Sequence, residues 1–355
     1  MNIVTEKGAF ISKSEAVMLQ AVAVMLMVWH HLFGFPDRIG VPCVRVLDTL
    51  LSEKLPIELY LAYFGRICIM VFAFSSGYGM RKKTINSLPT GILGNYKLIF
   101  RQLLKFFSRY WVVFFTFVPI GFLLKVYPVD LMRFVNGVLG VGAGYNQEWW
   151  YVASYAQVLL LFPLLTWLFD TIQEWVPALV HIIMVAFVAV LFLSGGIAGG
   201  NGLMEVLVGF LVGMYFASNQ LFEMTYRLVP KKSWIQLIVG VALFGVVFVL
   251  RFIGVPDYLL VALFVFSVMV IVKTSLVIRF VRPVLMFVGK YSTYIWLTHT
   301  FFGYYYFQKI TFAPRYSWLI FLWCMALSIA SGMVLEALLS LITKGTKKIF
   351  VRKTC

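Results

Sequence analysis

Ten stretches of this sequence are apolar enough to cross a lipid bilayer as helices. A spanning helix needs about 20 predominantly apolar residues, since only a helix of that length bonds its backbone polar groups internally across the hydrocarbon. The predicted spans cover residues 16–35, 57–80, 103–124, 148–169, 175–193, 203–218, 233–252, 256–273, 283–308 and 316–342. The sixth is short and contains Gly209 and Gly213, so a tilted or partly inserted helix is an alternative there. The pattern predicts an all-α, polytopic membrane protein.

Composition excludes the other broad classes. Hydrophobic residues make up 62% of the 355 residues and charged residues 12%, against about 25% charged in an ordinary soluble domain. This excludes a soluble enzyme, a disordered chain and a fibrous protein. No repeat and no low-complexity linker divides the chain, and the first apolar run lacks a small-residue cleavage site. We therefore expect one multi-pass membrane domain over residues 1–355, with no fused soluble domain, in the plasma or inner membrane.

The basic residues indicate an orientation. The formal net charge is +16, which in a soluble protein would suggest a nucleic-acid partner. In a membrane protein, cytoplasmic loops collect Lys and Arg. With the N-terminus inside, nineteen Lys and Arg fall in inner segments and eight in outer loops, while Arg66, Arg109 and Lys290 lie in or beside spans. The charge therefore predicts that both termini are cytoplasmic, and we expect no nucleic-acid partner.

The cysteines carry no recognisable metal or disulfide pattern. The four cysteines are Cys43, Cys68, Cys324 and Cys355. No two of them stand at the short spacing that zinc sites use, and they form no framework of paired spacings. We expect neither a metal site nor a disulfide scaffold.

Histidine and glutamate side chains fall in the outer halves of predicted spans. His30 and His31 stand near the end of the first span, His299 lies in the ninth, and Glu148 opens the fourth. An ionisable group in hydrocarbon is costly, so each is a candidate functional residue. A carboxylate beside an imidazole sets its tautomer and raises its basicity. These residues could therefore converge for acid–base chemistry; helix packing and interfacial anchoring are the structural alternatives.

Basic residues mark the inner side. Arg101, Lys105 and Arg109 recur every four residues where the third span begins, so they share one face of a helix. Such a stripe suits a phosphate-bearing ligand from the cytoplasm, although positive-inside topology explains many basic residues at helix ends. The small residues beside it, which permit close backbone approach, are Ser75, Ser76 and Gly77. A carrier with phosphates inside and a long arm reaching outward would join the two sites.

Five motifs occur together in one order along the chain. They are His31 in the first span, "VFAFSSGY", "RQLLKFFSR", "EWWYVASYAQVLLLFP" and "VGKYSTYIWLTHT". In these motifs and their spacing the chain resembles the acyltransferase-3 family of integral membrane acyltransferases, over nearly its whole length. The family has an Arg eleven residues before its catalytic His, and this chain has Gln20 there. That spacing selects His31 and leaves His30 as the second candidate, while another basic residue, such as Lys13 or Arg109, would replace the missing charge.

The resemblance implies transfer of an acyl group, most often acetyl, from cytoplasmic acyl-CoA to a hydroxyl of an extracytoplasmic carbohydrate. His31 would be the general base or a transient acyl carrier, and Glu148 or His299 would orient it or help to stabilise the oxyanion. The donor would bind at Arg101, Lys105 and Arg109, with Ser75, Ser76, Gly77 and Lys290 as further contacts. Acetyl-CoA, the carbohydrate acceptor and the lipid bilayer are thus the expected partners.

Two other functional classes fit parts of the pattern. A proton-coupled secondary transporter would also use His and Glu inside the membrane, but no internal two-fold repeat is visible. A lipid-binding scaffold would use the basic inner loops for anionic lipids. Dependence on acetyl-CoA discriminates the acyltransferase from both.

Overall fold

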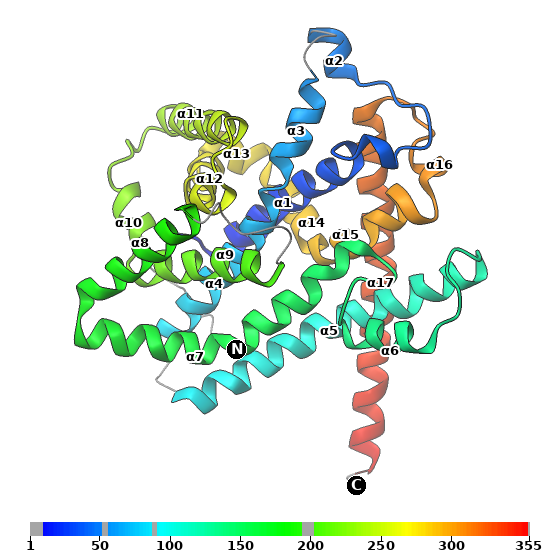
Figure 1. Ribbon diagram of the computed structural model, residues 1–355, viewed down its shortest axis with the longest axis horizontal. Helices are drawn as coiled ribbons and strands as arrows, with labels where there is room; N and C mark the ends of the chain where they lie inside the picture. Colours follow the sequence, from blue (N-terminus) through cyan, green and yellow to red (C-terminus); the bar gives the residue numbers. More distant parts are fainter. Residues whose placement is uncertain (1–9, 52–55, 87–90, 194–201, 354–355) are drawn as a thin grey trace. The chain divides into compact units, whose positions relative to one another are not determined.

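The computed structural model describes residues 10–51, 56–86, 91–193 and 202–353, and in these ranges the chain is helical with no β-strand (Figure 1). One isolated bridge joins Val44 to Tyr316. The predicted all-α class is therefore confirmed for the described residues.

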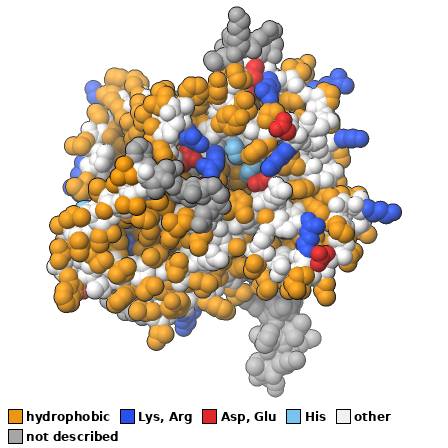
Figure 2. Space-filling model, viewed as in Figure 1, with side chains coloured by type: hydrophobic (Ala, Val, Ile, Leu, Met, Phe, Trp, Pro, Cys, Tyr) orange, Lys and Arg blue, Asp and Glu red, His pale blue; other side chains and the backbone are white. Residues whose placement is uncertain are grey.

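Six of the described helices or helix pairs are long and apolar enough to cross a membrane. They are Lys13–Phe33, Ile57–Ile85, Ile92–Leu123, Gln147–Trp175, Ser233–Phe252 and Ser317–Lys344. Shorter apolar helices cover Pro177–Leu191, Gly202–Ser218 and Asp257–Val272. Figure 2 shows many exposed hydrophobic side chains on the face in view, and in a membrane protein lipid covers side chains of this kind. The protein is a multi-pass helical membrane protein.

The predicted ninth span, residues 283–308, is not one helix. It consists of α14 (Arg282–Lys290), α15 (Ser292–Thr300) and a π-helical turn, η3 (Phe301–Tyr305). Tyr291, between α14 and α15, has φ −100° and ψ 6°, outside the helical range. Hydropathy averaged over a window of residues predicted a single span here and did not show these breaks. Single π-turns frequently accompany functional sites, and this one begins two residues after His299.

The described chain divides into two compact units, which we describe separately. The first comprises residues 1–23, 67–101 and 153–289, and the second comprises residues 24–66, 102–152 and 290–355. Four helices contribute residues to both: α1 (Lys13–Phe33), α5 (Gly91–Leu123), α7 (Trp150–Trp175) and α14, of which only Lys290 belongs to the second unit.

The first unit contains most of the helices from the middle part of the sequence. They are α4 (Cys68–Ile85), α8 (Pro177–Leu193), α9 (Gly202–Ser218), α10 (Leu221–Tyr226), α11 (Ser233–Phe252), α12 (Asp257–Val272), α13 (Ser275–Phe280) and most of α14. Helices α4 and α9 pack closely through glycines, since a Cβ on Gly213 would lie 2.2 Å from the carbonyl oxygen of Phe74. Close backbone contact at small residues is the usual way membrane helices associate. The glycines of the short sixth span therefore serve packing.

Among the described residues, three ion pairs join side chains from different segments of the first unit. Arg81 pairs with Asp170, and Lys82 Nζ lies 2.9 Å from Glu223 Oε1. Lys273 pairs with Glu15. Basic residues that the topology rule alone would place at a membrane face are thus matched by carboxylates within this unit.

The second unit carries the shorter elements and the long C-terminal helix. They are η1 (Pro36–Arg38), α2 (Val46–Leu51), α3 (Ile57–Gly65), α6 (Leu131–Leu139), η2 (Gln147–Trp149), α15, η3, α16 (Gln308–Thr311) and α17 (Ser317–Lys353). Helix α15 packs on α17, where a Cβ on Gly332 would lie 2.9 Å from the Tyr294 Cβ. Trp149 of η2 donates its indole N–H to the Leu297 carbonyl of α15. These contacts place α15 between η2 and α17.

Candidate active site

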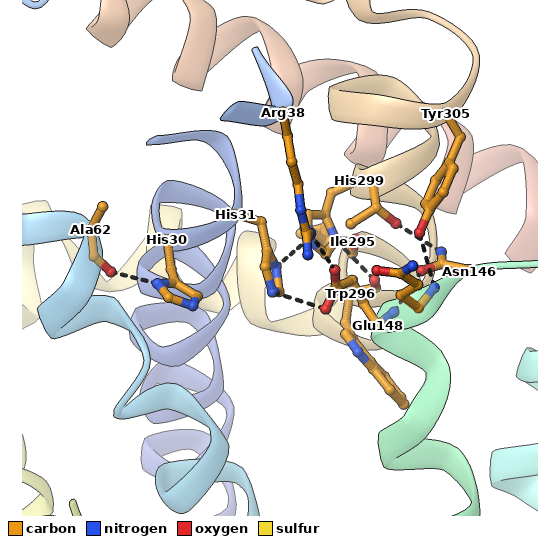
Figure 3. A network of polar contacts seen from close by, with 12 residues as sticks. His30, His31, Arg38, Ala62, Asn146, Glu148, Ile295, Trp296, His299 and Tyr305 are labelled. Carbon is orange, nitrogen blue, oxygen red and sulfur yellow. Dashed lines mark hydrogen bonds and ion pairs between the residues drawn. The ribbon is translucent and has the colours of Figure 1, made fainter. Parts of the chain in front are cut away.

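Two histidines from distant parts of the chain meet in the second unit. The Nδ1 atom of His31, near the end of α1, lies 2.8 Å from Nε2 of His299 in α15. Their rings are nearly parallel, 25° apart, with centroids 5.0 Å from each other. The histidine near the end of the first span and the histidine of the ninth predicted span therefore form one pair (Figure 3).

Glu148 reaches the other side of His31. Its Oε2 lies 3.3 Å from His31 Nε2, and its Oε1 lies 3.1 Å from Arg38 Nη1. The structure thus brings together His31, Glu148 and His299 in one network, and adds Arg38 of η1 (Figure 3).

The segment that carries Glu148 is held by Asn146. The Asn146 side-chain oxygen accepts from the Glu148 backbone N–H at 3.0 Å, as at a helix N-cap. Its amide nitrogen donates to Thr300 Oγ1 at 2.7 Å, and Asn146 is fully buried. The Tyr305 hydroxyl accepts from the Gln147 backbone N–H. Glu148 is therefore positioned by contacts to the same segment, 299–305, that carries His299.

The protons of the histidine pair follow from its neighbours. His299 Nδ1 faces two backbone carbonyl oxygens, of Ile295 at 3.0 Å and Trp296 at 2.8 Å. Carbonyl oxygens only accept, so this nitrogen carries hydrogen, and in a neutral ring the opposite nitrogen, Nε2, accepts. His31 Nδ1 must then be the donor of the 2.8 Å bond. The other nitrogen of His31, Nε2, faces a carboxylate oxygen of Glu148, which also only accepts, so Nε2 donates to Glu148 in this arrangement.

Exposure increases along the network from His299 to Arg38. His299 is 1% exposed. The side chains of His31 and Glu148 are each 12% exposed, and that of Arg38 is 37% exposed. Arg38 and the carboxylate of Glu148 therefore lie on the more exposed side of the network, and His299 lies on its buried side.

His30 points away from this network. Its Nδ1 lies 2.7 Å from the Ala62 carbonyl oxygen, so it donates to α3 (Figure 3). Gly65 of α3 packs against it, with an added Cβ only 3.0 Å from the His30 Cβ. Of the two adjacent candidates, the structure places His31 with Glu148 and His299, and His30 in a helix-packing position.

The basic stripe lies on α5 as its spacing predicts. Arg101 and Lys105 are exposed, and Arg109 is half-buried. Arg109 Nε lies 3.8 Å from Glu336 Oε2 of α17, and its guanidinium lies 5.7 Å from the centre of the Tyr294 ring. The Tyr294 hydroxyl donates to the same Glu336 oxygen at 2.6 Å. Arg109 thus has a carboxylate partner that the sequence did not indicate.

The remaining expected donor contacts divide between the units. In the first unit, Ser75 donates to the Val71 carbonyl and Ser76 bonds Tyr155. A Cβ on Gly77 would lie 2.1 Å from the Phe210 carbonyl oxygen, so this glycine packs α4 on α9. In the second unit, Lys290 is exposed at the end of α14, with Nζ 4.9 Å from the centre of the Tyr291 ring.

Sequence reasoning missed Arg38, Asn146 and Glu336. Arg38 counted only as an outer-loop charge, although Pro36 at the start of its segment favours a helical turn there. Asn146, two residues before Glu148, matches the N-cap preference and could have been found. Glu336 lies in an apolar helix, where an acidic residue is itself a signal.

Comparison with family models confirms the resemblance. The model of the acyltransferase-3 family, described as an acyltransferase domain, matches residues 18–337, which is nearly the whole chain. No curated protein and no solved structure gives a match. The chain therefore belongs to the acyltransferase-3 family, and it is a membrane acyltransferase enzyme.

Proposed function

We propose that this acyltransferase moves an acetyl group from cytoplasmic acetyl-CoA to a hydroxyl of an extracytoplasmic carbohydrate or glycoconjugate. The observation that supports the proposal is the His31–His299 contact, because it occupies Nδ1 and so makes Nε2 the nitrogen that can act as a base once Glu148 moves away. Family membership supplies the reaction class, O-acyl transfer in most cases.

The chemistry needs one proton acceptor at the hydroxyl. Neutral His31 accepts the proton of the acceptor hydroxyl at Nε2 while that oxygen bonds to the thioester carbon. The carbon–sulfur bond then breaks, and the imidazolium returns the proton to the departing thiolate, giving an ester and free CoA. Throughout, His31 Nδ1 keeps its hydrogen bond to His299, and in this proposal His299 rather than Glu148 orients the His31 ring.

The donor site is the basic face of α5. Arg101 and Lys105 are exposed and spaced for several phosphate groups, and a guanidinium or ammonium binds phosphate through charge-assisted hydrogen bonds. Arg109 stands one turn further along the same helix face. Lys290, in the second unit, is a further candidate contact. The pantetheine arm of the donor would carry the thioester from these residues towards His31.

This function requires donor and acceptor to be reached from opposite sides of the membrane, which agrees with the predicted topology of ten spans with both termini cytoplasmic in the plasma or inner membrane. The basic face of α5 would then open to the cytoplasm and the His31 site to the outside, where exported carbohydrate is available.

The decisive test compares the two adjacent histidines. Purified protein in lipid nanodiscs is supplied with acetyl-CoA and simple methyl glycosides, and thiol release and ester formation are measured. His31→Gln should lower kcat by about 10²–10⁴-fold. His30→Gln, the matched control, should keep most of the activity because Gln can still donate to the Ala62 carbonyl. Equal loss in both variants, or full activity of His31→Gln, would refute the assignment.

A further inference from the structure

The two carboxylate oxygens of Glu148 contact two different side chains. One carboxylate oxygen lies 3.3 Å from His31 Nε2, and the other lies 3.1 Å from Arg38 Nη1. Both oxygens are attached to a single carbon. The site between His31 Nε2 and Arg38 Nη1 therefore accommodates a carbon atom that carries two oxygens.

An acyl-transfer intermediate has the same requirement. Its tetrahedral carbon carries the attacking oxygen, which must lie at the base, and the oxyanion, which must lie at hydrogen-bond donors. If the intermediate takes the position of the Glu148 carboxylate, the attacking oxygen lies 3.3 Å from His31 Nε2 and the oxyanion lies 3.1 Å from Arg38 Nη1. Donors aimed at the developing charge are usually a large part of catalysis.

We infer that Arg38 is the catalytic cation that stabilises the oxyanion, and that the Glu148 side chain occupies the place of the reacting acyl group in the substrate-free site. This inference rests on the proposed function. In the reaction, Glu148 turns aside, and the thioester carbonyl takes its place. As the hydroxyl oxygen bonds to the carbon, the carbonyl electron pair moves to oxygen beside Arg38, and His31 holds the proton. Collapse re-forms the carbonyl and expels the thiolate, which takes that proton.

The surroundings of Arg38 fit this role. Its guanidinium lies 4.3 Å from the centre of the Phe35 ring and 5.4 Å from that of Tyr304, so aromatic faces restrict it. Gln308 donates to the Arg38 carbonyl at 2.7 Å and to the Gly303 carbonyl at 3.1 Å, which fixes the η1 backbone against η3. A cation that is held before substrate binds needs little rearrangement when charge develops.

A purely structural role for Arg38 would consist only of holding Glu148 in place. In that case Arg38→Gln should no longer lower kcat once Glu148 is replaced. The test is therefore a double-mutant cycle of Arg38→Gln and Glu148→Ala, with kcat and acetyl-CoA affinity measured in nanodiscs and Arg45→Gln as a matched arginine control in the same outer loop.

We expect Arg38→Gln to lower kcat by about 10²–10³-fold in both backgrounds, with donor affinity nearly unchanged and partial recovery in Arg38→Lys. Glu148→Ala should keep at least about a tenth of the wild-type kcat, because its side chain must leave the site in any case. Loss of the Arg38 effect in the Glu148→Ala background would overturn the inference. So would a folded, donor-binding Glu148→Ala protein without activity.

Formate gives a second readout in Glu148→Ala. If the carboxylate position is the acyl position, formate binds there and competes with acetyl-CoA, and Arg38→Gln removes this inhibition. Activation by formate would show that Glu148 is a required catalytic group, and absence of any effect would also overturn the shared position. Failure of the proposed function is separate: it would appear as full activity in His31→Gln, whatever Arg38 does.

Discussion

His31 Nδ1 and His299 Nε2 lie 2.8 Å apart, and His299 is anchored in turn by the carbonyls of Ile295 and Trp296. A buried imidazole thus takes the place that a carboxylate holds in many catalytic triads. It fixes the tautomer of its partner without adding a formal charge inside the membrane.

Replacing His299 should impair the base without preventing donor binding. His299→Leu removes the acceptor for the His31 Nδ1 hydrogen, so the ring can adopt the wrong tautomer. We expect kcat to fall by about 10²-fold or more, and His299→Gln to recover part of it because the amide oxygen accepts. Turnover and the pH profile of kcat/KM report the change, and acetyl-CoA binding is the folding control. Unchanged kcat in His299→Leu would contradict the orienting role.

Asn146 and Thr300 should act as a pair. Their 2.7 Å buried hydrogen bond ties η2 to the end of α15. Removing one partner leaves the other unsatisfied, at a cost of about 1–3 kcal/mol. Asn146→Ala and Thr300→Val should each lower the unfolding temperature, and the double variant should cost less than their sum. Thermal unfolding of the three variants measures the coupling; strict additivity would show that the bond does not link the two segments.

Substitution of Arg109 should weaken donor binding, whereas substitution of its partner Glu336 should not. Arg109→Ala removes a phosphate-binding cation and should raise the Kd for acetyl-CoA by about 10-fold or more, more than it affects the acceptor. Glu336→Gln frees the same guanidinium from a carboxylate and should leave donor affinity unchanged or tighter. Equilibrium binding at several salt concentrations distinguishes them. Weaker acceptor use with normal donor binding in Arg109→Ala would contradict the inner site.

Glu223 should make the first unit sensitive to acid. Burial raises the pKa of its carboxyl, but the hydrogen bond and charge of Lys82 and the Phe10 backbone N–H outweigh burial and hold that pKa below its ordinary value. A carboxyl with a lower pKa in the folded than in the unfolded state stabilises the fold above its unfolded pKa, and this contribution is lost as pH falls through the folded pKa.

Glu223→Gln should therefore lower the unfolding temperature by a few degrees near neutral pH and reduce the further loss towards about pH 4. Thermal unfolding across this range measures it. Glu174→Gln, at an exposed carboxylate of α7 in the same unit, should change neither. An unaltered pH dependence in Glu223→Gln would show that the Lys82 pair contributes nothing to stability.

Reporter fusions test the orientation. The loop charges place the residues after α17 in the cytoplasm and the segment between α5 and α6 outside. A reporter after Cys355 should read inside, and one inserted after Lys125 should read outside. The opposite pattern would reverse the membrane sides assigned to donor and acceptor.

Helical class, most spans and the identity of the histidines were accessible from sequence because they depend on local properties. Hydropathy over a window predicts a span, and an ionisable residue within it stands out on cost alone. The break at Tyr291 was not accessible, since hydropathy averaged over a window does not report the backbone conformation at one residue. The partners of Arg109 and Glu148 were not accessible either, because Glu336 and Arg38 lie 227 and 110 residues away in sequence.

The sequence by itself determined that this is a membrane protein with helical spans. It also showed that His31, Glu148 and His299 are ionisable residues in predicted spans, where such side chains are rare. Only the tertiary structure decided that His31 and not His30 joins the network. It also decided that His299 contacts Nδ1 of His31 and that Arg38 pairs with Glu148. The physical reason is directional. Hydropathy sums over many residues, whereas a hydrogen bond depends on which way one ring faces, and that direction is set by helices packed together from distant parts of the chain.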